Sequence, residues 1–195
     1  MTDHEQLTEK ESLRIISEMM IKVRKDFYDT GVSALLWGSV ITFCGLFSFL
    51  GSTFKWGFDY YYVWNLTFFA IIPQIWIAKT ERKKRKAKDN IDTGSAIWAV
   101  FAITMFGLVF YNLNVAEVAK MSSLYLLVYA VPTLTTGLVR KFPPMVIGSI
   151  ICYACFIASF YMPNNMVMLL QAIAGCSCWL IPGIILQQRY KKSRQ

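Results

Sequence analysis

The chain has 195 residues, of which 55% are hydrophobic and 16% charged, and its formal net charge is +8 at pH 7. The apolar residues form long blocks between short polar connectors, which disfavours a soluble helical protein. The basic residues lie in those connectors rather than on one folded face, so nucleic-acid binding is also disfavoured. The single histidine, His4, excludes paired-histidine haem ligation and a Ser-His-Asp triad.

The N-terminal segment 1–30 is predicted to contain an amphipathic cytoplasmic or interfacial helix. Thr8 and Glu11 have the spacing of a capping box, and apolar residues recur at intervals of three and four over 8–28. Such a helix can lie in the membrane interface, with its cations near anionic headgroups. It could equally pack against a partner helix or a second copy of the chain.

Six apolar stretches of about 18–22 residues follow this segment, none with a charge at its centre. A helix needs about 20 apolar residues to cross the hydrocarbon core of a bilayer. We therefore predict an all-α integral membrane protein with a six-helix transmembrane domain at 31–188 and a basic cytoplasmic tail at 189–195. The predicted spans are about 31–50, 61–79, 94–112, 122–139, 144–162 and 166–187.

The distribution of positive charge predicts the orientation of these spans. Eighteen of the twenty Lys and Arg residues lie in or next to the N-terminal segment, the connectors 80–93 and 140–143, and the C-terminal tail. The alternate connectors hold only Lys55 and Lys120. Because basic loops stay on the cytoplasmic side during insertion, we expect an inner-membrane protein with both termini in the cytoplasm.

The densest group of cations follows the second predicted span. Each cation near an anionic surface contributes about 1 kcal/mol of attraction, so we expect contact with anionic lipids of the inner leaflet. The alternative is that these residues act only as a signal for topology. The residues expected to contact anionic lipid are Arg82, Lys83, Lys84, Arg85, Lys86 and Lys88.

The spans resemble one another at the spacing of helical hairpins. The first and third share an Asp-Thr-Gly start, a Trp, an Ile-Thr pair and a Gly-Leu pair, at 29–31, 37, 41–42 and 45–46 and at 92–94, 98, 103–104 and 107–108. The fifth matches through Gly148–Tyr153, set against Gly38–Phe43, and each even span carries a proline before a basic exit. This pattern predicts three parallel hairpin repeats, with chance similarity among apolar sequences as the alternative.

The prolines of the even spans suggest a candidate site. A proline within a helix removes a backbone hydrogen bond and commonly kinks the helix, so three kinks at one depth could widen a vestibule facing the cytoplasm. They could also simply let the hairpins splay around one another. Polar residues nearby could line such a vestibule or form hydrogen bonds between helices. The predicted vestibule residues are Pro73, Gln74, Pro132, Thr133, Gln171 and Pro182.

Residues suited to catalysis are scarce in the spans. No Asp or Glu lies inside a predicted span, which disfavours proton-coupled transport and ion pumping. The five cysteines all lie in spans, and the pairs Cys152/Cys155 and Cys176/Cys178 could together suit zinc or an iron–sulfur cluster. Free cysteines also pack well as small apolar residues. We predict no enzymatic activity, no cofactor and no metal site.

Small residues spaced four apart predict close contacts between helices. Such pairs let two backbones approach, which is a main source of stability for helix packing in membranes. The pairs are Ala34 with Gly38, Gly148 with Cys152, Ala154 with Ala158, and Ala174 with Cys178.

Two resemblances to known families follow from short motifs. Glu11–Met19, with Asp29-Thr30-Gly31 and Leu36-Trp37-Gly38, resembles uncharacterised six-pass integral membrane proteins of Bacteroidota, and it covers mainly the first third of the chain. Ile72–Ile75, with its basic exit, resembles the proline–glutamine loop of SWEET-type transporters, in which the motif recurs in three-helix repeats. Here the other two prolines lack the glutamine and the repeating units are hairpins.

We therefore predict a non-enzymatic, multi-pass inner-membrane protein that serves as an accessory or regulatory subunit. Its amphipathic segment and basic loop would be the cytoplasmic contact surfaces. The expected partners are the bilayer, including its anionic lipids, and either another membrane protein or a second copy of the chain. The alternative is a small-solute or lipid transporter built around the three prolines.

Overall fold

The computed structural model describes residues 30–84, 93–114 and 122–192, and every regular element in these ranges is a helix. The predicted amphipathic helix in the N-terminal segment lies outside the described residues. The elements are α2 (Val32–Thr53), the 3₁₀ helix η1 (Tyr60–Asn65), α3 (Leu66–Lys84), α4 (Thr93–Asn114), α5 (Ser122–Val139), α6 (Pro143–Ser159), α7 (Asn164–Gly175), the π-helical turn η3 (Cys176–Leu180) and α8 (Ile181–Lys192).

Three helical segments in the described part of the chain are long and apolar enough to cross a membrane. They are Val32–Thr53, Ser122–Val139 and Asn164–Lys192, the last of which combines α7, η3 and α8. Shorter apolar helices extend over Ala96–Asn112 and Pro143–Ser159. These lengths and compositions indicate a helical membrane protein.

The second predicted span, at about 61–79, differs most from its observed form. Tyr60–Asn65 forms η1, and the α-helix runs only from Leu66 to Lys84. The Asp59 side chain accepts a hydrogen bond from the Tyr61 amide at 3.0 Å. Local bonds of this kind offer the backbone an alternative to the α-helix, and so the α-helix begins later than hydropathy indicates.

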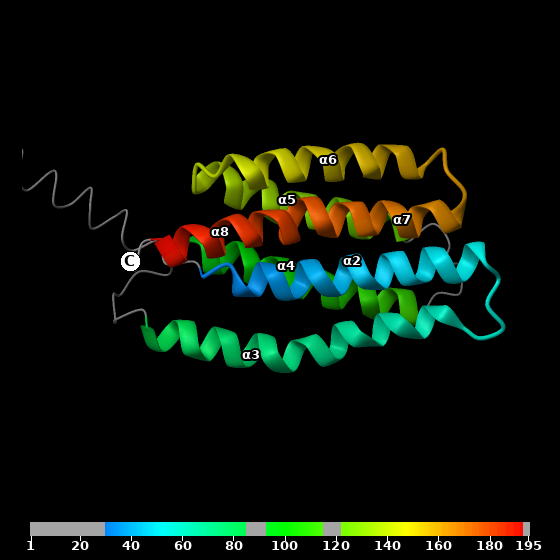
Figure 1. The fold of residues 1–195 in the computed structure, drawn as a ribbon, viewed down its shortest axis with the longest axis horizontal. Helices are drawn as coiled ribbons and strands as arrows, with labels where there is room; N and C mark the ends of the chain where they lie inside the picture. Colours follow the sequence, from blue (N-terminus) through cyan, green and yellow to red (C-terminus); the bar gives the residue numbers. More distant parts are fainter. Residues whose placement is uncertain (1–29, 85–92, 115–121, 193–195) are drawn as a thin grey trace, which may run out of the picture.

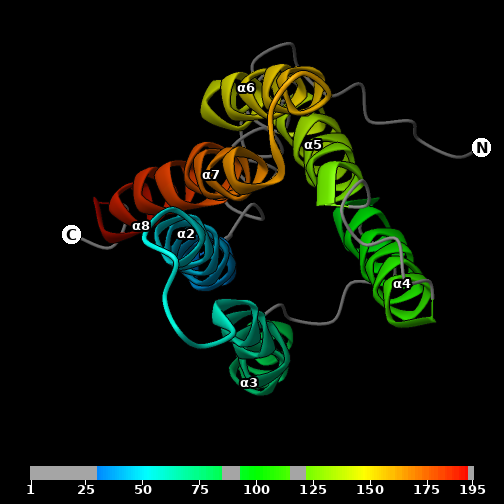
Figure 2. The same ribbon diagram turned by 90° about the vertical axis from the view of Figure 1, so that its right-hand side faces the viewer.

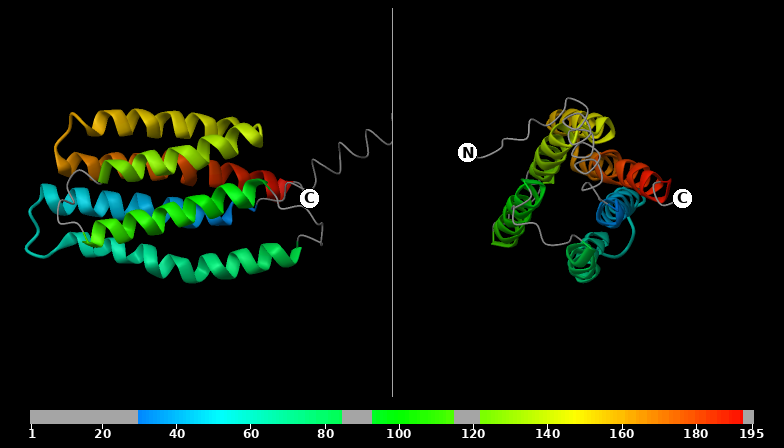
Figure 3. Two further views of the ribbon diagram at one scale, coloured as in Figure 1. Left: turned by 180° about the vertical axis from the view of Figure 1, so that it is seen from behind. Right: turned by 90° about the vertical axis from the view of Figure 1, so that its left-hand side faces the viewer.

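Seen end-on, the helices form an open arc in the order α3, α2, α7–α8, α6, α5 and α4 (Figure 2). All of them run along the long axis of the molecule (Figure 1). Neighbours in this order are packed pairs, and the view from the opposite end shows the same arrangement (Figure 3). α3 and α4 stand at the two ends of the arc and share no extended contact among the described residues.

The core lies where the last helix packs between α2 and α6. A Cβ atom on Gly38 would lie 2.4 Å from the backbone nitrogen of Leu180, and one on Gly148 would lie 2.1 Å from the carbonyl oxygen of Ser177. η3 is therefore held between two glycines, and only glycine leaves room for these approaches. The predicted close contacts are confirmed at Gly38 and Gly148, whereas Ala154 is exposed.

The two end helices contribute few buried residues to this core, although Trp98, Phe101 and Met105 on one face of α4 pack against it. Among the described side chains, only Ala70 is buried in α3 and none is buried in α4. An apolar surface of this extent is unfavourable in water and suits the hydrocarbon region of a membrane. The most exposed large side chains of the two helices are Phe69, Ile72 and Trp76 in α3 and Ile103 and Phe110 in α4.

Candidate functional site

The first of the three proline positions lies between α2 and α3. Pro73 is inside α3, and the amide of the next residue, Gln74, contacts α2 through both of its polar atoms. Gln74 Oε1 accepts a hydrogen bond from the Trp37 indole at 3.2 Å, and Gln74 Nε2 donates to the Ser33 hydroxyl at 3.2 Å. The polar groups of this position therefore join the two helices of the first hairpin.

A groove of about 450 Å³ runs beside Pro73 on the α2–α3 interface. Its walls are almost entirely apolar, which suits an acyl chain better than a charged solute. Pro73 is the one predicted vestibule residue among those that line it. The lining residues are Leu36, Ser39, Val40, Phe43, Leu66, Phe69, Ala70 and Pro73.

The second proline position lies in the core. Pro132 and Thr133 are both buried in α5. The Thr133 hydroxyl accepts a hydrogen bond from the Trp179 indole at 3.0 Å and donates to the Tyr129 carbonyl oxygen at 2.8 Å. At both positions, the residue after the proline therefore accepts a hydrogen bond from a tryptophan indole.

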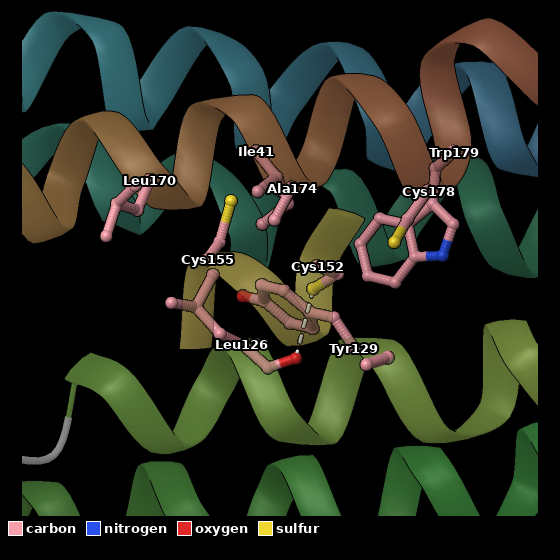
Figure 4. Packing of buried hydrophobic residues seen from close by; sticks show 10 residues of the cluster. Ile41, Leu126, Tyr129, Cys152, Cys155, Leu170, Ala174, Cys178 and Trp179 are labelled. Atoms are coloured by element: carbon pink, nitrogen blue, oxygen red, sulfur yellow. Dashed lines mark hydrogen bonds between the residues drawn. The ribbon is translucent and has the colours of Figure 1, made fainter. Parts of the chain in front are cut away.

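Trp179 is the centre of an aromatic cluster that the sequence did not reveal. Its side chain is 3% exposed, and its ring centroid lies 4.9 Å from that of Tyr129, 5.9 Å from that of Phe101 and 6.4 Å from that of Trp98. Figure 4 shows Trp179 and Tyr129 side by side in the core, next to Cys178. Aromatic pairs at these distances stabilise a core beyond the area that they bury.

The remaining predicted vestibule residues belong to the last helix. Gln171 is 2% exposed, and its Nε2 donates to the carbonyl oxygen of Ser122 at 2.8 Å, which joins α7 to α5. Pro182 is buried in the first turn of α8. The polar vestibule residues are therefore bonded at three separate interfaces, α2–α3, α5–η3 and α5–α7. A shared vestibule stays a prediction.

The five cysteines are free thiols, and four of them are buried. Among the residues that the structure describes, no three His, Cys, Asp or Glu side chains are grouped so that they could hold a metal ion. Three of the thiols donate hydrogen bonds of 3.1–3.4 Å to backbone carbonyl oxygens. These contacts favour a packing role for the three cysteines. The pairs are Cys44 with Val63, Cys152 with Leu126 (Figure 4), and Cys178 with Gly148.

Basic residues gather at one end of the molecule. Those predicted to contact anionic lipid begin in the last turn of α3, at 82–84, and the others lie at 85–88, outside the described residues. The last turn of α8 carries Arg189, Lys191 and Lys192, and the Arg189 guanidinium lies 5.1 Å from the ring centroid of Phe142 in the α5–α6 connection. Figure 1 places the ends of α3 and α8 and the α5–α6 connection at the same end of the molecule.

The sequence matches no known protein family, and it has no significant match among curated proteins or solved structures. The resemblances to Bacteroidota membrane proteins and to SWEET-type transporters therefore stay predictions.

Proposed function

We propose that this chain is a six-pass inner-membrane protein of non-enzymatic type, an accessory or regulatory subunit that acts through helix contacts and cytoplasmic contacts. One observation carries the proposal: the polar side chains best placed to line a solute path are used between helices. Gln74, Thr133 and Gln171 each bond to a neighbouring helix. A solute path through these positions would have to break these contacts.

The proposed topology has six spans, arranged as three parallel hairpins with both termini in the cytoplasm. Two features support it. The described helices form six rods that run along one axis, with α7, η3 and α8 as a single rod (Figure 1). The basic ends of α3 and α8 lie together at one end of these rods, as the bias of cations toward the cytoplasmic side requires.

A transporter of lipids or small solutes is the second candidate. The observation that favours it is the apolar groove between α2 and α3, which contains Pro73 in its wall. A groove open along the side of a bundle could hold an acyl chain. Movement of α3 about its proline would then change the shape of the groove.

Flux measurements separate the two candidates. We expect purified protein in liposomes to give no protein-dependent flux of small fluorescent solutes and no protein-dependent transfer of labelled lipid between leaflets. The measurement uses the wild-type chain, the Pro73→Ala, Pro132→Ala, Pro182→Ala triple variant, and Pro163→Ala as a control in the outer turn before α7. Flux that the triple variant loses and the control retains would establish the transporter and refute the subunit.

A further inference from the structure

Two interfaces between hairpins share a hydrogen bond from matching positions. Thr42 in α2 and Cys152 in α6 occupy the same place in the matched sequences Gly38–Phe43 and Gly148–Tyr153. The Thr42 hydroxyl donates to the carbonyl oxygen of Ala172 at 3.4 Å, and the Cys152 thiol donates to that of Leu126 at 3.1 Å. In both cases the first helix of one hairpin, α2 or α6, contacts the second helix of another hairpin.

α4, the first helix of the remaining hairpin, has matching residues but lacks this contact. Thr104, which matches Thr42, is exposed and donates to the Val100 carbonyl oxygen of its own helix at 2.9 Å. Gly107 matches Gly45. A Cβ atom on Gly45 would lie 2.8 Å from backbone atoms of α7, whereas one on Gly107 would meet nothing within 4 Å among the described residues.

We propose that a second copy of this chain covers α4, and that the helix it supplies is its own α3. α3 is the second helix of its hairpin, and its Pro73 matches Pro132 in α5 and Pro182 in the last helix. These two helices are the ones that contact α6 and α2, respectively. α3 is also exposed, at the opposite end of the arc (Figure 2). This inference depends on the proposed six-pass topology, because α3 and α4 must both cross the membrane for α3 of one copy to lie along α4 of the other.

A two-fold axis along the membrane normal gives a partner helix to both ends of each arc, α3 and α4. When two arcs face each other, α3 of each copy meets α4 of the other, and no end helix is left without a partner. Closed two-fold assemblies of this kind are the commonest oligomers. The open glycine surface of α4 suits close approach by a helix, which is the usual basis for helix association in membranes.

Cross-linking between two differently tagged copies tests the proposal. One copy carries Ile103→Cys in α4 and the other carries Phe68→Cys in α3, at side chains that are 72% and 48% exposed. Ile41, which matches Ile103, packs against Gly175 of the last helix, so position 103 should face the docked helix. Co-expression and oxidation in membranes should give a mixed disulfide dimer several-fold above a control pair of Ile103→Cys with Ile150→Cys on α6, a position that is 59% exposed.

The control separates docking from random collision, and the parent chain shows the background from native thiols. A yield equal to the control pair would mean that lipid covers α4. A disulfide that forms only within a single chain carrying both substitutions would mean that its own α3 closes the arc. A cross-link to a different protein would assign α4 to another partner. Each of these three results would overturn the proposal.

A second measurement does not depend on introduced cysteines. Gly107→Leu should shift the purified protein from dimer toward monomer by several-fold, because the added side chain blocks close approach of the second copy. Gly57→Leu is the matched control, since a Cβ atom at Gly57 also meets nothing within 4 Å. An unchanged dimer fraction in Gly107→Leu would contradict the proposal. A positive flux assay would refute the proposed function while leaving this inference intact.

Discussion

Replacing Gly148 with alanine should sharply reduce the yield of folded protein. The new Cβ atom would lie 2.1 Å from the Ser177 carbonyl oxygen, well inside contact distance, and the atom it meets belongs to the backbone of η3 rather than to a flexible side chain. Overpacking a core typically costs about 1–3 kcal/mol, and more when two helices must separate. Because Gly38 holds η3 from the other side, the turn cannot simply move away.

Gly57→Ala is the control for this substitution. A Cβ atom at Gly57 meets nothing within 4 Å among the described residues, and Gly57 lies in the connector between α2 and η1, away from the helix contacts of the core. This variant should therefore be about as stable as the wild type. Thermal unfolding in detergent, followed by size-exclusion chromatography, measures both. Equal melting temperatures for the two variants would show that η3 is not tightly held.

Replacing Trp179 with alanine should have the largest effect of any single side-chain truncation that we consider. The side chain is 3% exposed and contacts aromatic rings from α4 and α5. Removing a buried aromatic side chain typically costs about 3–5 kcal/mol, because a cavity remains. Trp76→Ala is the control, since Trp76 is 71% exposed on α3 and its loss should change stability little.

Trp179→Phe separates ring packing from the hydrogen bond. This variant retains an aromatic ring but loses the bond from the indole N–H to the Thr133 hydroxyl. A hydrogen bond between membrane helices contributes about 0.6 kcal/mol on average, so Trp179→Phe should lie much nearer to the wild type than Trp179→Ala. Melting temperatures in one detergent give the order. If Trp179→Ala were as mild as Trp76→Ala, the aromatic cluster would not be the centre of the core.

The sequence predicted the helices well because hydropathy is a sum over neighbouring residues. The fourth span was predicted at 122–139, and α5 has these bounds. Glycines at Gly38 and Gly148 were recognised because small residues four apart indicate one helix face. η1 and η3 were not predicted. Both depend on local hydrogen bonding and on close approach by other helices, which hydropathy does not report.

The order of helices in the arc could not be predicted from the sequence. Hairpins place sequential helices side by side, but the contact of α2 with the last helix joins the first predicted span to the sixth. It depends on Gly45 and Gly175 meeting partners more than a hundred residues away. The Thr133–Trp179 hydrogen bond could not be predicted for the same reason, since neither residue type by itself specifies its partner.

Thiol labelling of intact cells tests the proposed topology most directly. Phe58→Cys and Asn164→Cys lie in connectors predicted to face outward, and Phe58 is 58% exposed, so both positions should react with a reagent that cannot cross the membrane. Lys86→Cys should react only after the cells are permeabilised, because its basic connector is predicted to be cytoplasmic. The parent chain, with four of its five cysteines buried, gives the background. Labelling of position 86 in intact cells, or none at positions 58 and 164, would contradict six spans with both termini inside.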